Sequence, residues 1–430
     1  MSAIQVRPLQ EPWESRLNVP GDKSISHRAL MLAAMSDGPC RLSDLSQGKD
    51  VQSTLRCLKQ MGITARRDRA DLLLTGWGNR WQEPDRVLDC GNSGTSMRLL
   101  TGILAGCPGL CVLSGDASLR NRPMGRVLEP LLEMGARVRG RQGNRFAPLV
   151  VEGTELQGIY HKLRVASAQV KSCILLAGLK AGGTTVLEEP QQSRDHTERM
   201  LSHLGVRITR DENRLHLSPA ERIPAFDCRV PGDVSSAAFL VTAAVISPGA
   251  RVLIDDVGLN PTRTAYLDLL RQMGARITTR VTRTDLGEPV GSIEALGSEL
   301  VGMQVPESEI PGAIDELPLL AVAASQAKGT TLVRGAAELR VKESDRIHST
   351  VTELRKLGAE VEEFEDGFAV HGPTPLKGAT VECHHDHRLE MSLAVAGLVA
   401  RGKTRIQGTG WAAISFPSFW ESFPGPWQEL

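Results

Sequence analysis

Six short polar stretches in this sequence stand directly before, or within the first turn of, Ala- and Leu-rich runs that predict helices. They are GDKSISHR, GNSGTSMR, ASAQVKS, GDVSS, AIDELP and DHRLEMS. A helix N-terminus presents unpaired backbone N–H groups and the positive end of the helix dipole, so it attracts anions. Ser, Asp and Asn at such positions also cap helices without binding a ligand. The stretches therefore predict either simple caps or a set of anion-binding helix ends.

Cations separate these two interpretations for two of the stretches. Lys23 and Arg28 follow the glycine of GDKSISHR, and Arg98 follows the glycines of GNSGTSMR. Glycine lets the backbone approach a ligand closely, and a cation adds charge that capping does not need. GDVSS has no cation, so we assign it to capping. PGDKSISHR looks like part of a P-loop, but the full pattern G-x-x-x-x-G-K-[ST] is absent, so the run does not indicate a nucleotide site.

Further Arg and Lys residues gather in three motifs. These are RNRPMGR with Arg120, Arg122 and Arg126, QSRDHTER with Arg194 and Arg199, and LRVKESDR with Arg340, Lys342 and Arg346. Acids alternate with bases in the last two, which is also typical of a solvated helix face. LRVKESDR favours a site more strongly, because Lys342 and Arg346 are four residues apart and can point the same way.

Acidic residues offer the proton chemistry. Asp315 and Glu316 stand directly ahead of the apolar run LPLLAVAA. An acid there either stabilises the helix N-terminus or serves as a general base in a cationic site, and the sequence leaves both open. HHDHR at 384–388 also invites a metal site. However, it has no second ligand cluster with matching spacing and no H-E-x-x-H motif, so we predict no metal.

The elements that must position these residues recur along the chain. An Ala- and Leu-rich stretch, a glycine and a strand-like run occur six times, with the glycines roughly 70 residues apart. A second helix end with glycine, such as LLEMGARV, falls in five of these units. Each unit therefore predicts βαβαββ. Six units in one core would exceed the usual domain size, so we predict two domains of three units.

Bulk composition excludes several classes of protein. The chain has 430 residues, 41% of them hydrophobic and 23% charged, which indicates a soluble globular protein. Fifty basic residues balance fifty acidic ones, so no nucleic-acid partner is predicted. Eight Cys form no C-x-x-C pair, which favours a reducing cytosol. No apolar run is long enough to cross a membrane, and the first twenty residues do not resemble a signal peptide. We therefore expect a mature cytoplasmic protein without a membrane partner.

Seven motifs, in order and over nearly the whole chain, resemble the 5-enolpyruvylshikimate-3-phosphate synthase family of enolpyruvyl transferases. They are PGDKSISHR, GNSGTSMR, RPMGR, SAQVKS, DELPLLAVAA, RVKESDR and DHRLEMS. The resemblance implies an α/β fold, a two-domain inside-out α/β barrel with six βαβαββ repeats, three per domain. It places 21–230 in an N-terminal domain and 1–20 with 231–430 in a C-terminal domain. The hinges would lie near Pro20 and Pro231.

The resemblance also implies an activity. Members transfer the enolpyruvyl group of phosphoenolpyruvate to the 5-hydroxyl of shikimate 3-phosphate and release phosphate, through a tetrahedral intermediate in a closed cleft between the domains. No metal or organic cofactor is expected, and a monomer is implied by analogy. Gly94 stands where insensitive members often have Ala, so we expect the inhibitor glyphosate to compete with phosphoenolpyruvate.

Site residues are carried over position by position. The catalytic ones are Asp315 as base for the hydroxyl, with Glu343 and Lys23 for the proton on carbon. Those expected around phosphoenolpyruvate are Lys23, Gly94, Arg122, Gln169, Arg346 and Arg388. Those expected around shikimate 3-phosphate are Ser24, Arg28, Ser167, Ala168, Gln169, Arg194, Asp315 and Lys342. Supporting residues are Asn92, Thr95, Arg98, Lys171, Ser193 and His387. Lys171 and Arg194 resemble the variant of the family in which basic residues reinforce the 3-phosphate site.

The chain departs from the family pattern at one position. Many members carry a Lys directly before the Thr-Phe-Pro of the C-terminal segment, whereas this chain reads AAISFP and has Ile414 there. Either another cation replaces that Lys or the contact is absent.

Two alternatives accompany this interpretation. The sister enolpyruvyl transferase that acts on a UDP-amino sugar shares the fold, but it carries Lys-Asn where this chain has Lys23-Ser24 and uses a loop Cys that has no match here. A non-catalytic anion-binding protein of the same fold would have lost the acid and base, yet Asp315 and Glu343 are both present.

Overall fold

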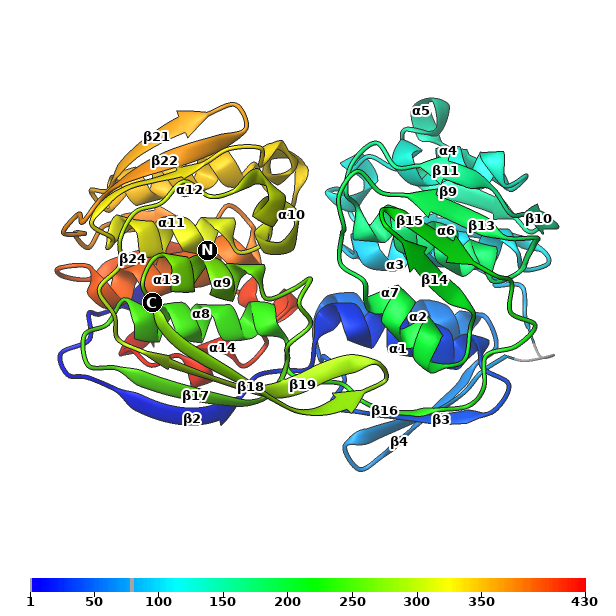
Figure 1. The fold of residues 1–430 in the computed structure, drawn as a ribbon, viewed down its shortest axis with the longest axis horizontal. Helices are drawn as coiled ribbons and strands as arrows, with labels where there is room; N and C mark the ends of the chain where they lie inside the picture. The colour runs from blue at the N-terminus through cyan, green and yellow to red at the C-terminus, as the bar shows by residue number, and fades with distance from the viewer. Residues whose placement is uncertain (1, 78–80) are drawn as a thin grey trace. The chain divides into compact units, whose positions relative to one another are not determined.

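The computed structural model describes residues 2–77 and 81–430 and has a mixed α/β fold (Figure 1). The chain forms two compact units. The N-terminal unit comprises Gly21–Val230 together with Thr284–Glu288. The C-terminal unit comprises the described part of Met1–Pro20, Pro231–Arg283 and Pro289–Leu430. The sequence-based boundaries place 284–288 with the C-terminal domain, whereas these five residues pack with the N-terminal unit. Leu286 is buried in the core of that unit.

The N-terminal unit alternates helices and short strands. Its helices are α1 (Lys23–Met35), α2 (Lys49–Gln60), α3 (Gly94–Ala105), α4 (Gly125–Glu133), α5 (Arg141–Asn144), α6 (Ala168–Gly178) and α7 (His196–His203). Its strands are β3 (Pro39–Ser43), β4 (Thr64–Asp68), β5 (Asp71–Thr75), β6 (Leu88–Asp89), β7 (Leu110–Ser114), β8 (Arg137–Gly140), β9 (Phe146–Glu152), β10 (Leu156–Gln157), β11 (Tyr160–Lys162), β12 (Ala181–Gly182), β13 (Thr185–Glu188), β14 (Ile208–Asp211), β15 (Arg214–Leu217) and β16 (Asp227–Arg229).

The C-terminal unit alternates in the same way. Its helices are α8 (Val234–Val245), α9 (Ala265–Gln272), α10 (Ile310–Ala313), α11 (Leu317–Ser325), α12 (Arg346–Lys356), α13 (His387–Val399) and α14 (Phe419–Ser422). Its strands are β1 (Ala3–Val6), β2 (Glu14–Asn18), β17 (Arg251–Gly258), β18 (Arg276–Asp285), β19 (Glu288–Leu296), β20 (Gly329–Val333), β21 (Glu360–Phe364), β22 (Gly367–Gly372), β23 (Thr380–Glu382), β24 (Thr404–Gln407) and β25 (Trp427–Glu429). The turn that joins β18 to β19 is the segment that packs with the other unit.

The larger sheets share one pairing pattern. In the order β16-β3-β5-β4, β3 pairs parallel with β16 and antiparallel with β5, which pairs antiparallel with β4. The orders β6-β7-β9-β8 and β11-β13-β15-β14 repeat this pattern in the N-terminal unit. In the C-terminal unit, β23-β24-β1-β25 repeats it as well. In the same unit, the orders β2-β17-β19-β18 and β20-β22-β21 contain the antiparallel pairs of this pattern, such as β17 with β19 and β20 with β22.

The Ala- and Leu-rich stretches form helices that are buried on almost every side. All residues of α8 and α11 are buried, and these two helices pack against each other and against α13 (Figure 1). A helix that is apolar all round belongs in a core, since it has no solvated face. In the N-terminal unit, α3 packs against α6 and α1. These central helices carry the polar clusters at their N-termini.

Glycine ends the more amphipathic helices as the sequence predicts. Gly135 after α4 and Gly274 after α9 have φ of 86° and 99°, a left-handed conformation that favours glycine. The same positive φ occurs at the matching glycines Gly62, Gly205 and Gly358. These turns send the chain back from helix to strand within each unit. None of the helices in the described part of the chain combines the length and the apolar character needed to cross a membrane.

Candidate active site

Side-chain caps begin four of the six central helices. Asp22 accepts a hydrogen bond from the N–H of Ile25 at 2.8 Å, and Ser93 accepts one from the N–H of Ser96 at 3.1 Å. Asp233 and Asp386 cap α8 and α13 in the same manner. Capping and ligand binding are thus not exclusive, because these caps use acidic or hydroxyl side chains and do not involve the neighbouring Lys and Arg side chains.

The start of α1 is built around two cations. Lys23 is the first residue of the helix, and its Nζ donates to Oδ2 of Asp50 at 3.2 Å. One turn later, the buried Arg28 donates from Nε to Thr197 on α7 and from Nη2 to Ser172 on α6, both at 2.7 Å. Its Nη1 also donates to the carbonyl oxygen of Ser24 at 2.9 Å. Arg28 therefore ties three helix starts together.

A second group surrounds the start of α3. Arg98 donates from Nη1 to Oε1 of Gln169, whose Nε2 donates to the Thr95 hydroxyl at 3.0 Å. Gly94 lies close to two guanidiniums, since a Cβ there would stand 3.1 Å from Nη1 of Arg98 and 3.5 Å from Nη1 of Arg122. The N-terminal unit thus brings together two cations from different motifs at a position without a side chain.

The remaining predicted residues of this unit lie around these groups. Arg122 donates from Nη2 to Oδ1 of Asn92 at 2.7 Å. Ser167 and Ala168 stand at the start of α6, and Arg194 lies in the loop before α7. Lys171 is predicted to support the phosphate site, but its side chain is fully buried, and its ammonium pairs with Glu189 and Glu198.

The C-terminal unit gathers the predicted acids and bases around Arg346. Asp315 accepts from Nη1 of Arg346 at 3.2 Å and lies 3.4 Å from Nζ of Lys342. Glu343 accepts from Nη2 of Arg346 at 2.6 Å. Nη2 of Arg388 is 3.8 Å from Oδ2 of Asp315. The expectation that Lys342 and Arg346 point the same way is confirmed, because both reach one carboxylate.

Asp386 completes this cluster. It is fully buried and accepts from Nε of Arg346 at 2.7 Å. Burial acts to raise the pKa of Asp386, but the Arg346 guanidinium outweighs it and keeps that pKa below its usual value. Burial acts to lower the pKa of Arg346, and the carboxylates of Asp386, Glu343 and Asp315 raise it instead. Arg346 therefore stays a permanent cation between three acids.

Asp386, the acid of the HHDHR run, thus pairs with Arg346. The three histidines of the run lie in different surroundings. Nε2 of His384 lies 2.7 Å from Oε1 of Glu353. The ring of His385 packs on Trp411 with centroids 5.1 Å apart. His387 is buried at the first turn of α13, where its Nδ1 lies 3.9 Å from Oδ1 of Asp386.

Three residues outside the predicted site, Ser235, Arg263 and Glu316, form hydrogen bonds that join the start of α8 to this cluster. Arg388 donates from Nη1 to Oε1 of Glu316 at 2.7 Å, and the Ser235 hydroxyl donates to the same oxygen at 2.6 Å. Nη2 of Arg263 donates to Ser235 at 2.7 Å. Sequence reasoning missed Arg263, although it stands just before α9 as Arg194 stands just before α7. Aligning the repeats on their second helix would have found it.

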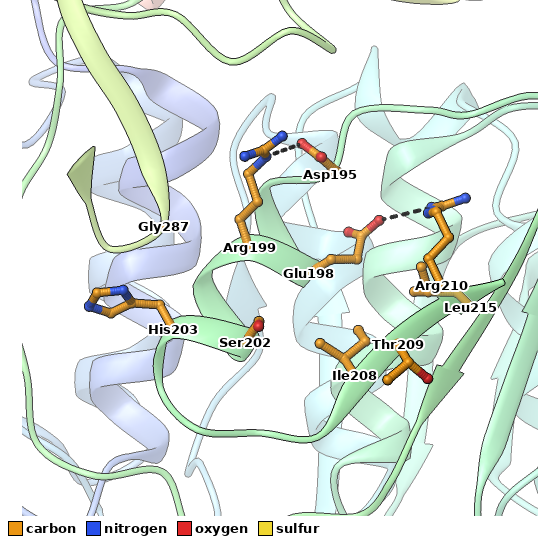
Figure 2. Close-up of a pocket in the computed structure, with 10 residues that line it drawn as sticks. All are labelled: Asp195, Glu198, Arg199, Ser202, His203, Ile208, Thr209, Arg210, Leu215 and Gly287. Carbon is orange, nitrogen blue, oxygen red and sulfur yellow. Dashed lines mark hydrogen bonds and ion pairs between the residues drawn. The ribbon is translucent and has the colours of Figure 1, made fainter. Parts of the chain in front are cut away.

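A pocket of about 420 Å³ opens elsewhere in the N-terminal unit (Figure 2). Its lining residues are Asp195, Glu198, Arg199, Ser202, His203, Ile208, Thr209, Arg210, Leu215 and Gly287. No residue of the predicted substrate sites belongs to this set. Arg199 pairs with Asp195 at 2.9 Å, so the charges in the pocket are partly matched within the protein.

Comparison with known proteins gives one consistent result. The EPSP synthase (3-phosphoshikimate 1-carboxyvinyltransferase) family matches residues 9–423. A 3-phosphoshikimate 1-carboxyvinyltransferase of Bacillus thuringiensis subsp. konkukian is 45% identical over 422 residues, which cover 98% of each chain. That of Synechococcus sp. (strain JA-3-3Ab) is 49% identical over 409 residues, 94% of this chain and 92% of the relative. A solved EPSP synthase from Acinetobacter baumannii superposes with a TM-score of 0.90 at 40% identity and covers 100% of both chains.

Proposed function

The chain belongs to the EPSP synthase family, and from that premise we propose that it transfers the enolpyruvyl group of phosphoenolpyruvate to the 5-hydroxyl of shikimate 3-phosphate. The family predicted from the sequence is thereby confirmed, and so is the prediction of an enzyme. The observation that best supports this reaction is the Asp315 cluster. It offers one carboxylate as base, a second carboxylate on the same guanidinium, and fixed cations for anionic substrates.

The addition step requires two proton transfers, and the elimination step requires a third. Asp315 takes the proton of the 5-hydroxyl as the hydroxyl oxygen attacks C2 of phosphoenolpyruvate. Glu343 and Lys23 supply a proton to C3. The resulting tetrahedral intermediate then returns one methyl proton to these two groups as the bond to phosphate breaks, which restores the double bond and releases phosphate. Arg122, Arg346 and Arg388 offset the charge of phosphoenolpyruvate, and Arg28 and Arg194 offset that of shikimate 3-phosphate.

The finer architecture is part of the same proposal. We place the chain in the inside-out barrel with three βαβαββ repeats in each of two domains. One is 21–230 with the turn at 284–288, and the other is 1–20 with 231–283 and 289–430. The two close over the substrates about hinges near Pro20 and Pro231, which excludes water from the reacting atoms. The enzyme acts as a cytoplasmic monomer without a metal or organic cofactor.

Phosphate release tests the activity directly. With shikimate 3-phosphate and phosphoenolpyruvate together, we expect turnover and a new enolpyruvyl ether detectable by mass spectrometry. Omitting either substrate, or replacing shikimate 3-phosphate with UDP-N-acetylglucosamine, should give background release only. Release with the nucleotide sugar would favour the sister transferase. Binding of both substrates without turnover would favour the non-catalytic alternative.

Gly94 provides a test of the phosphoenolpyruvate subsite. Glyphosate is expected to inhibit competitively with phosphoenolpyruvate, and Gly94→Ala to raise its inhibition constant by about tenfold or more, roughly 1.4 kcal/mol. The reason is that a Cβ would press on Nη1 of Arg98 at 3.1 Å. Gly106→Ala at the other end of α3 is the matched control, because its Cβ meets Lys180 at an ordinary 3.4 Å. An unchanged inhibition constant in Gly94→Ala would place glyphosate elsewhere.

A further inference from the structure

Ser193 is held by all three of its polar groups. Its N–H donates to Oε1 of Glu189 at 3.1 Å, and its hydroxyl donates to the same oxygen at 2.5 Å. Its carbonyl oxygen accepts from Nζ of Lys171 at 3.1 Å. We call these three residues the Ser193 clasp. Because the hydroxyl proton is directed at Glu189, Ser193 has none to donate to a ligand while the clasp is intact.

The clasp is buried and balanced in charge. The side chains of Lys171 and Glu189 are both 0% exposed. Oε2 of Glu189 accepts from Lys171 at 3.1 Å and from Nη2 of Arg210 at 2.7 Å, while Glu198 lies 2.7 Å from Lys171. Two cations thus face two carboxylates. Burial acts to raise the pKa of Glu189, but the charge of Lys171 and the bonds it accepts outweigh this and lower it.

Burying charged groups is costly, and their attraction and hydrogen bonds offset the lost hydration only when the pairing geometry is good. Replacing paired charges by apolar residues is often neutral or stabilising, so stability alone gives little reason for two buried pairs. The clasp instead specifies a conformation, because it joins α6, which carries Lys171 and begins at Ala168, to the loop before α7. That loop contains Arg194 directly after Ser193.

We propose that Lys171 and Glu189 are positioning residues that hold the loop so that Arg194 faces the 3-phosphate. This rests on the proposed function, in which Arg194 binds shikimate 3-phosphate. Recognition of the phosphate at this loop then comes from Arg194 and not from the Ser193 hydroxyl. We expect the clasp to act mainly on shikimate 3-phosphate, because the residues assigned to phosphoenolpyruvate alone, such as Arg122 and Arg346, are not among its partners.

Two partners of the clasp, Glu198 and Arg210, line the pocket. Arg210 on β14 lines it, and its side chain is 26% exposed (Figure 2). Arg210→Met removes one of the bonds to Glu189 but leaves Lys171 and Ser193 in place. Arg199→Gln is the matched control, since Arg199 lines the same pocket but pairs with Asp195.

Substrate-resolved kinetics test the proposal. In Glu189→Gln and Lys171→Met, KM for shikimate 3-phosphate should rise by about 10- to 100-fold, the range expected for losing a charge-assisted hydrogen bond. KM for phosphoenolpyruvate and kcat should stay within about threefold. Arg210→Met should give a smaller rise of about threefold, Lys171→Arg should recover part of the loss, and Arg199→Gln should match the parent chain. Calorimetry with shikimate 3-phosphate alone should show the same order.

Several results would overturn it. Folded Glu189→Gln and Lys171→Met that bind shikimate 3-phosphate as the parent does would show that the clasp positions nothing. An equal loss for both substrates would show a general structural role. If those two variants do not fold, parent-like binding by Arg210→Met contradicts the proposal by itself. Failure of the proposed function is distinct, because the parent chain would then release no phosphate from the two substrates.

Discussion

Asp315→Asn is expected to lower kcat by about 10²- to 10⁴-fold, the usual contribution of general acid–base catalysis. Asparagine has nearly the same shape and can still accept from Arg346, which donates to Asp315 at 3.2 Å. It cannot take a proton from the 5-hydroxyl. Steady-state kinetics at saturating concentrations of both substrates, with single-turnover measurements, would separate this loss from weaker binding.

The control for Asp315→Asn removes a carboxylate charge elsewhere in the same unit. Asp268 is half exposed and pairs with Arg271 at 2.5 Å on α9, so Asp268→Asn should leave kcat within about twofold, as expected of a surface ion pair. A value of kcat in Asp315→Asn within tenfold of the parent would contradict the role of Asp315 as base. Glu343 would then be the next candidate, because it shares Arg346 with Asp315.

The sequence predicts well those site residues whose positions depend on nearby residues in the chain. Lys23 and Gly94 stand at helix starts, and helix starts can be read from caps and apolar runs. Lys342 and Arg346 are four residues apart and do reach one carboxylate. Lys342 lies in the loop before α12 and Arg346 is the first residue of that helix, so the two reach the carboxylate through the course of this loop and not through helical spacing.

The parts that escaped prediction depend on pairs of distant elements. Asp50 is the partner of Lys23, and Glu189 that of Lys171, yet local spacing relates neither acid to its base. An acid within a short polar stretch looks the same whether it is solvated or buried. The turn at 284–288 is a similar case, because nothing local to Leu286 indicates that it enters the core of the other unit.

The segment that leads to Ile414 also depends on a residue from a distant element. The position where many family members carry a Lys is buried here, so it contributes packing and not charge. The segment before it is held by Glu390 on α13. Oε2 of Glu390 accepts from the backbone N–H groups of Gly410, Trp411 and Ala412 at 3.0, 2.7 and 3.1 Å.

Glu390 is therefore expected to be among the most important residues for stability. Its side chain is fully buried, and Oε1 also accepts from Nε1 of Trp420 at 3.1 Å. Glu390→Ala leaves these four donors without their acceptor, and hydrogen bonds to charged groups contribute roughly 1.5–3 kcal/mol each. We expect the free energy of unfolding to fall by about 3 kcal/mol or more. The loss should be smaller than the sum of four such bonds, because the freed donors can form some hydrogen bonds to water.

Thermal and urea unfolding would measure this loss. The thermal midpoint should fall by roughly 6–12 °C for a unit of about 200 residues. Glu390→Gln should lose about half as much, since its oxygen can still serve the three backbone donors while its amide faces the Trp420 N–H. Glu421→Ala, an exposed acid on α14, should change stability by less than about 0.5 kcal/mol. Equal midpoints for Glu390→Ala and Glu421→Ala would mean that the segment does not depend on Glu390. Packing of Ile414 and Phe416 would then have to hold the segment. A bound substrate could not do so through position 414, because this chain has no Lys there.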